Sequence, residues 1–123
     1  MNALGILAQE IQGLHIPYEF MRWTGGMEYP YFTGEYSEVA TLTEDGHKEY
    51  TVMVNGFTRG SWLELEQARE AIERHFPTAG GFRAQSDDGS VAIYYSNSFP
   101  VPTDEAELKR IQITLDVHEW KGM

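Results

Sequence analysis

The chain has 123 residues and a mass of 14.0 kDa, with 41% hydrophobic and 13% aromatic residues. A chain of this length fits one domain, which buries roughly two-thirds of the surface of its unfolded state, so we expect a single folded domain over residues 1–123 and no disorder. The 19 acidic residues outnumber the 9 basic ones, and the formal net charge of −10 disfavours sequence-specific binding to nucleic acid.

The composition also excludes several classes of protein. The absence of cysteine removes disulfides, thiol nucleophiles and cysteine-ligated zinc sites, and it fits a reducing compartment. The longest apolar runs span only a few residues, and Gln9 and Glu10 interrupt the N-terminal segment where a signal peptide would be apolar throughout. We therefore expect neither a membrane span nor a secretion signal.

The first third of the chain predicts one helix and two or three strands. Asn2 is a suitable N-cap for a helix that ends before Pro17, because apolar residues recur at spacings of three and four (Leu4, Leu7, Ile11 and Leu14). Residues 18–23 then predict a short strand before a glycine turn. The aromatic stretch 27–42 contains Pro30 and Gly34, which favour an edge strand or a bulged one.

A hairpin and a second helix follow. The turn Glu44, Asp45, Gly46 leads into a half-buried strand over residues 47–58. Ser61 and Glu64 have the spacing of a capping box and predict the start of a helix that ends before Pro77. Its buried stripe is predicted from the spacing of the apolar residues Leu65, Ala68, Ile72 and Phe76.

The last third predicts three more strands. Residues 82–85 and 91–95 flank the turn 87–89, which has a hairpin composition. Residues 98–108 predict an extended loop with a capped helical turn at Thr103 or Asp104, and residues 111–117 alternate cleanly as a final strand. This order predicts an α+β fold, with a mostly antiparallel sheet of four to six strands and two helices packed on one face.

The sequence shows no clear pattern of metal-binding, catalytic or phosphate-binding residues. The four histidines (His15, His47, His75 and His118) lack the spacing that places two ligands on one helical face, so we expect no metal site, with His15 and His75 at helix C-termini and the other two solvated. The capping box explains Ser61, and the glycine pairs lack a phosphate-binding spacing. Catalysis and cofactors are therefore not expected, and only Glu28, Glu35 and Glu38 stand beside aromatics that could form a groove.

Aromatic residues are concentrated in one segment. Four aromatic residues lie within eight consecutive positions, namely Tyr29, Tyr31, Phe32 and Tyr36. One edge strand over a small core does not easily bury that many rings. Two interpretations stay open at this point. Some of these rings face a partner, or alternate rings enter the core while the tyrosine hydroxyls reach water.

Three blocks carry a resemblance to a known family: PYEFMRWTGGMEYPYFTGEYSEV, NGFTRGSWLELEQAREAIERHFP and VAIYYSNSFPVPTDEAELKRIQITLDVHEWK. They are similar to tail-completion proteins, small virion proteins encoded by long-tailed phages and prophages of Gram-positive bacteria. The resemblance implies a fold like that of tail terminators and a role as a tail terminator or head-tail joining protein. Such a protein forms a ring, usually a hexamer, on the finished tail tube, and DNA passes through its lumen without specific binding.

The resemblance also implies partners and places. The ring would contact copies of itself, the tail tube protein and the head connector protein, at the head-proximal end of the tail in the virion, after assembly in the host cytoplasm. By the same resemblance, the contacts come from Tyr29, Tyr31, Phe32 and Tyr36 and from the Asp45 hairpin, while Arg59 pairs with an acid of a neighbouring subunit. An intrachain role for Arg59 stays equally open.

Two other classes of function compete with this one. A small acidic phage protein could mimic DNA and inhibit a host nuclease, although the acids here are divided among turns and a helix that also carries arginines. Another minor tail component is a closer variant of the first hypothesis. A hydrolase comes last, and it would require a deep polar pocket holding two of Glu28, Glu35 and His47.

Overall fold

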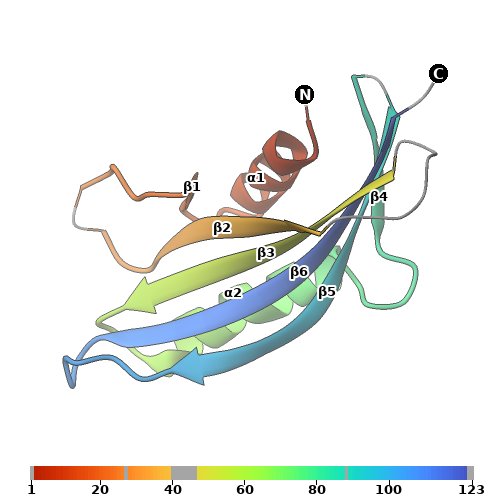
Figure 1. The fold of residues 1–123 in the computed structure, drawn as a ribbon. Coiled ribbons are helices and arrows are strands. Elements are labelled where there is room, and N and C mark those ends of the chain that lie inside the picture. Colours follow the sequence, from red (N-terminus) through yellow and green to blue (C-terminus); the bar gives the residue numbers. More distant parts are fainter. Residues whose placement is uncertain (1, 27, 40–46, 88, 122–123) are drawn as a thin grey trace.

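The computed structural model describes residues 2–26, 28–39, 47–87 and 89–121. Within them the chain forms two helices and a curled sheet of six strands (Figure 1), in the strand order β1-β2-β3-β6-β5-β4. The elements are α1 (Ala3–Gly13), β1 (Tyr18–Phe20), β2 (Tyr31–Val39), β3 (His47–Thr58), α2 (Trp62–His75), β4 (Phe82–Ser86), β5 (Gly89–Val101) and β6 (Lys109–Lys121). Among the strands of these residues, β1 and β2 pair in parallel and the other four pairs are antiparallel, so the predicted α+β fold with a mostly antiparallel sheet is confirmed.

Both helices begin at the residues that the sequence predicts. The side chain of Asn2 accepts a hydrogen bond from the Gly5 amide at 2.8 Å, which satisfies one of the free amides of the first turn of α1. Ser61 and Glu64 form a capping box at α2, in which Glu64 Oε1 accepts from the Ser61 amide at 3.3 Å. These caps are local interactions, so they are readable from sequence.

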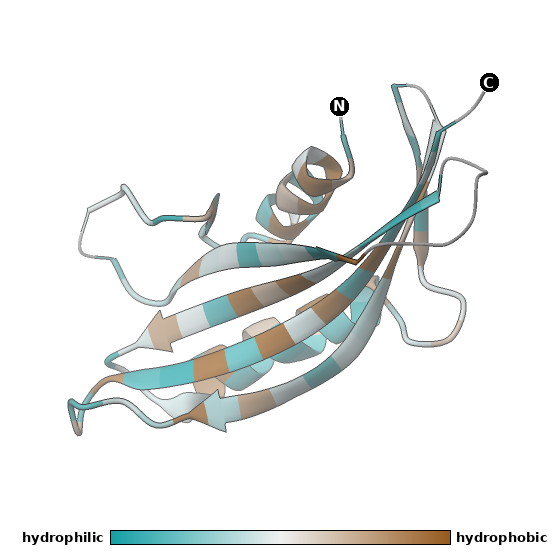
Figure 2. Ribbon diagram, in the orientation of Figure 1, coloured by the Kyte–Doolittle hydropathy of each residue, from teal (hydrophilic) through white to brown (hydrophobic). Residues whose placement is uncertain are grey.

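The core lies between the helices and one face of the sheet. Figure 1 shows both helices behind the sheet, as predicted. Alternate residues of the paired strands face them, as the bands of hydropathy along β3 and β6 show (Figure 2), and Val52 and Val54 lie opposite Leu115 and Ile113. All four of these side chains are fully buried, which is why the clean alternation of β6 predicts its face so well.

Two glycines leave space for aromatic side chains that pack against the strands. A Cβ atom added to Gly56 would lie 2.2 Å from the ring of Phe32, its partner across β2 and β3. A Cβ on Gly34 would lie 2.0 Å from the hydroxyl oxygen of Tyr18. Because these rings occupy the space of the missing side chains, Phe32 is a core residue with no exposed surface.

Three details differ from the prediction. β1 has three residues rather than six and pairs with the first half of β2, so β2 is an edge strand only beyond Gly34. β5 continues through Pro100 to Val101, where the sequence predicts a loop. β4 pairs with β5 no further than Ile93. Because no described strand lies on that side of β5 at Pro100, the N–H group that proline lacks is not needed for pairing there. Residues 104–107 form bends and turns, where the sequence predicts a capped helical turn at Thr103 or Asp104. No helix in the described ranges is long and apolar enough to cross a membrane.

Candidate functional site: the uncovered face and the two edges of the sheet

In the described part of the chain, both helices lie on one face of the sheet, and we call the other face the uncovered face. The register aligns its side chains in rows that cross β2, β3, β6 and β5. One row consists of Tyr31, Phe57, Arg110 and Val101, and a row toward the other end contains Val39, Glu49, His118 and Ala92. The rows thus bring together residues that are as many as 79 positions apart in the chain.

Stacked rings make the first of these rows. The ring of Trp23 lies 5.1 Å from that of Tyr31, and Tyr31 lies 5.0 Å from Phe57, with interplanar angles of 25° and 23°. The guanidinium of Arg110 lies 5.6 Å from the Phe57 ring. Arg110 also donates to Oδ1 of the buried Asn55 at 2.8 Å, which fixes its position. We call Trp23, Tyr31, Phe57 and Arg110 the aromatic row; rings held in this way lose little freedom on meeting a partner.

Arg59 lies beside this row and pairs within its own chain. Its Nε donates to the Tyr29 hydroxyl at 3.2 Å, and its Nη2 forms an ion pair with Glu105. Tyr29 in turn lies 5.7 Å from Tyr31. Arg59 therefore has intrachain partners, which is one of the two predicted alternatives. Any contact with a neighbouring subunit would be made by Arg59 together with Tyr29 and Glu105 rather than by a free arginine.

The aromatic segment is divided between the two faces of the sheet. Tyr31 is on the uncovered face, whereas Phe32 is buried in the core. Phe32 is therefore not available for the contact with a partner that was predicted for it. Tyr36 is 42% exposed on the helix side, where it stacks on Phe20 at 5.6 Å. Met21, which is 55% exposed, adopts a positive φ of 71° next to Phe20. We call Phe20, Met21 and Tyr36 the β1-edge patch. Asp45, the remaining predicted contact, lies outside the described residues.

The opposite edge of the sheet has its own apolar surface. Beyond its pairing with β4, β5 contains a register shift between Tyr95 and Asn97 and then an exposed segment that includes Phe99, at 46% exposure, and Pro100. We call Phe99 and Pro100 the β5-edge patch. A bulge and a proline hinder the addition of another strand, so contacts at this edge would be made by side chains.

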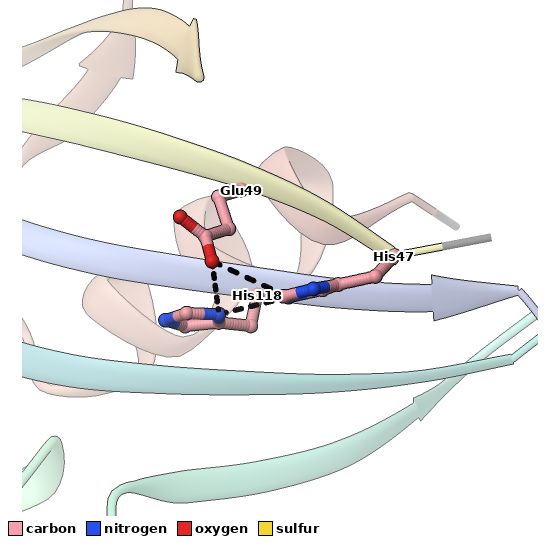
Figure 3. Close-up of side chains that lie close together, drawn as sticks. All are labelled: His47, Glu49 and His118. Atoms are coloured by element: carbon pink, nitrogen blue, oxygen red, sulfur yellow. Dashed lines mark hydrogen bonds and ion pairs between the residues drawn. The ribbon is translucent and has the colours of Figure 1, made fainter. Parts of the chain in front are cut away.

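A third feature of the uncovered face is a cluster of His47, Glu49 and His118 (Figure 3), the His–Glu cluster. Glu49 and His118 are direct partners across β3 and β6, and His47 lies two residues from Glu49 on the same face. His47 Nε2 lies 3.0 Å from His118 Nδ1, and Glu49 Oε1 lies 3.8 Å and 3.6 Å from these two nitrogens. The ring of Trp120 stacks on His47 with centroids 4.9 Å apart and an interplanar angle of 6°.

This cluster corrects the prediction for two of the histidines. The side chains of His47 and His118 are only 15% and 27% exposed, so they are not simply solvated. His75 does lie in the last turn of α2, as expected, where its Nε2 is 2.8 Å from Glu10 Oε1. A signal for the cluster existed in the sequence, since His47 and Glu49 share one face of a predicted strand, but the pairing with the strand of His118 could not be read from it.

Glu35 and Glu38, two of the acids considered for catalysis, do not gather with His47. Glu35 lies opposite Met53, six residues along β3 from His47, which separates the two by about 20 Å. A pocket holding both Glu35 and His47 is therefore not formed. Glu38 lies within 4.0 Å of Lys48, as an exposed ion pair.

Comparisons with known proteins find a similar fold in solved structures. No protein-family model matches the sequence, and no curated protein matches it. A solved structure without a functional name is 18% identical, with a TM-score of 0.70 over 95% of this chain and 90% of the other. A chain in the virion of a native gene transfer agent particle is 12% identical, with a TM-score of 0.69 over 89% of this chain and 84% of the other. At these identities, the likeness shows that the fold is shared.

Proposed function

We propose that this protein is a structural component of a phage or phage-like virion, and specifically a tail-completion protein. The observation that carries the proposal is the fold shared with a chain of a gene transfer agent virion, over 89% of this chain and 84% of that one. The coverage matters because it leaves little of either chain outside the common fold. A fold alone does not determine a function. The proposal of a tail-completion role is therefore argued from the surfaces described above.

The two edge patches suit a ring. A closed ring needs a heterologous contact, in which one patch on each subunit meets a different patch on the next. The β1-edge patch and the β5-edge patch lie at opposite edges of one sheet, and both expose large apolar side chains. In the proposed ring these two patches meet between neighbours. The aromatic row on the uncovered face then remains to contact the tail tube protein or the head connector protein.

The distribution of charge favours this role over that of a DNA-mimicking inhibitor. On α2, Arg69 lies within 3.7 Å of three acids, Glu66, Glu70 and Glu73. Partial burial lowers the pKa of Arg69, but its side-chain hydrogen bonds with Glu66, Tyr95 and Glu73 and the charge of Glu66 outweigh this effect and raise the pKa above its ordinary value. A surface of acids with an arginine among them is a poor copy of a row of unpaired phosphates.

The first experiment tests the role in the virion. The gene is deleted from the phage or prophage that encodes it, and induced lysates are compared by electron microscopy with those of a complemented strain. We expect full heads beside tails that are overlong or unjoined, and mass spectrometry should find the protein in purified complemented particles. Normal, infectious particles from the deletion strain would refute the role, and a pull-down for host nucleases would then test the inhibitor.

The second experiment tests the ring contact. Met21→Asp and Phe99→Asp each place a charge in one edge patch, and both should prevent rings in native mass spectrometry. Because each variant keeps one intact patch, mixing the two should give a heterodimer and no larger species. Leu63→Asp is the matched control: Leu63 is 63% exposed on α2 and belongs to neither edge patch, and an acid in the first turn of a helix favours it. Rings that persist in both edge variants would overturn this arrangement.

A further inference from the structure

The His–Glu cluster is built like a metal site, and the virion role does not call for one. We propose that His47, Glu49 and His118 bind one divalent transition-metal ion, with Zn²⁺ as the reference ion. Two imidazoles and one carboxylate form a donor set that zinc takes in proteins. The site is independent of the ring contacts, since neither edge patch contributes to it.

The distances between the donors match the size of such an ion. The three atoms His47 Nε2, His118 Nδ1 and Glu49 Oε1 are separated by 3.0, 3.8 and 3.6 Å. The point equidistant from them lies about 2.0 Å from each, which is the length of a Zn–N or Zn–O bond. A tetrahedral ion needs donors about 3.3 Å apart, so side-chain shifts of about 0.5 Å or less complete the geometry.

The sheet fixes the three donors before any ion binds. Glu49 and His118 face one another in the register of two long strands, and His47 follows from the period of two along β3. Trp120 stacks on His47, and Tyr94 and His118 form a T-shaped pair with ring centroids 5.7 Å apart. Donors on strands, with rings held by neighbouring aromatics, are the arrangement that a preorganised site requires.

Within the described residues the cluster supplies three donors. Three protein ligands with a fourth position for water or another donor are typical of zinc sites that are not purely structural. The side chains are 15%, 27% and 36% exposed, so an ion can reach them from solvent. In the absence of an ion, the two imidazole nitrogens share a hydrogen bond at 3.0 Å, and the ion takes the place of that proton.

Equilibrium dialysis of the full chain against Zn²⁺, after treatment with a chelator, tests the proposal. We expect one zinc per chain in the wild type. His118→Gln and His47→Gln should each weaken binding at least about 10–100-fold, the loss that even an outer-shell partner causes. His75→Gln is the matched control, because His75 pairs with a single carboxylate, Glu10, and it should bind zinc as the wild type does.

The variant Glu49→Gln distinguishes loss of zinc binding from loss of the folded state. Glutamine keeps the size of the side chain but offers zinc a neutral amide in place of the carboxylate, so this variant should stay folded in the presence of chelator and bind zinc at least about tenfold more weakly. Two results would overturn the proposal. One is a wild-type protein that takes up no zinc. The other is uptake that is unchanged in His118→Gln, His47→Gln and Glu49→Gln, which would place the ion elsewhere.

Discussion

Tyr18 offers a direct test of how the β1 end of the sheet is packed. Its ring lies over Gly34, the residue is only 3% exposed, and its hydroxyl oxygen has no hydrogen-bond partner within the described residues. Burial without a partner disfavours the charged phenolate, and it raises the pKa of Tyr18 from 10.0 to about 12. In the unfolded chain the same group titrates near its ordinary value.

This difference in pKa makes stability depend on pH. Since the folded pKa is the higher one, the contribution of Tyr18 is fully present below about pH 10 and is lost as the pH rises toward 12. Each pKa unit corresponds to about 1.4 kcal/mol, so the full loss is about 2.7 kcal/mol, of which about 2 kcal/mol is reached at about pH 11.5. Tyr18→Phe has no group to titrate at this position and should escape that loss.

Urea unfolding followed by circular dichroism measures the effect. The free energy of unfolding of the wild type and of Tyr18→Phe is compared at about pH 7, 10 and 11.5. At neutral pH we expect Tyr18→Phe to be at least as stable as the wild type, because it removes a buried hydroxyl without a partner. Other tyrosines titrate in both proteins and cancel in the difference. Parallel loss of stability by the two proteins above pH 10 would refute the reasoning.

Three further predictions test other parts of the fold. Gly56→Ala should lower the free energy of unfolding by about 1–3 kcal/mol, as overpacking against the ring of Phe32 does, measured by the same urea titration. Glu64→Ala should cost about 1–2 kcal/mol, since its carboxylate serves both the cap of α2 and a buried hydroxyl of β3; an unchanged urea midpoint would contradict this. Arg59→Glu should leave the monomer folded by circular dichroism, because its contact with Glu105 is exposed. It should nevertheless abolish virion assembly, because Tyr29, its other partner, lies against the aromatic row that is proposed to contact the tail tube or the head connector; intact assembly would argue against a contact at this cluster.

The elements that could be predicted from sequence are those that local interactions determine. The capping box at Ser61 involves residues three apart, and the alternation of β6 from Ile111 to Val117 needs only the pleat of a strand. The end of β5 could not be predicted from sequence for a related reason. Pro100 is a poor strand residue where an amide must be donated, but nothing local shows that this stretch of β5 has no β4 partner.

The candidate sites depend on register, which periodicity does not supply. A period of two assigns His47 and Glu49 to one face of β3, but it does not say which strand lies beside them or which residue lies opposite. Only the pairing of Glu49 with His118, 69 residues later, turns three ordinary polar residues into a cluster. The same is true of the aromatic row, in which Tyr31 meets Phe57 and Arg110 through two separate strand pairings. The proposed sites in this fold therefore depend on the non-local pairings. A substitution that shifts the register of β3 against β6 would disrupt the His–Glu cluster and the aromatic row together while leaving the local elements intact.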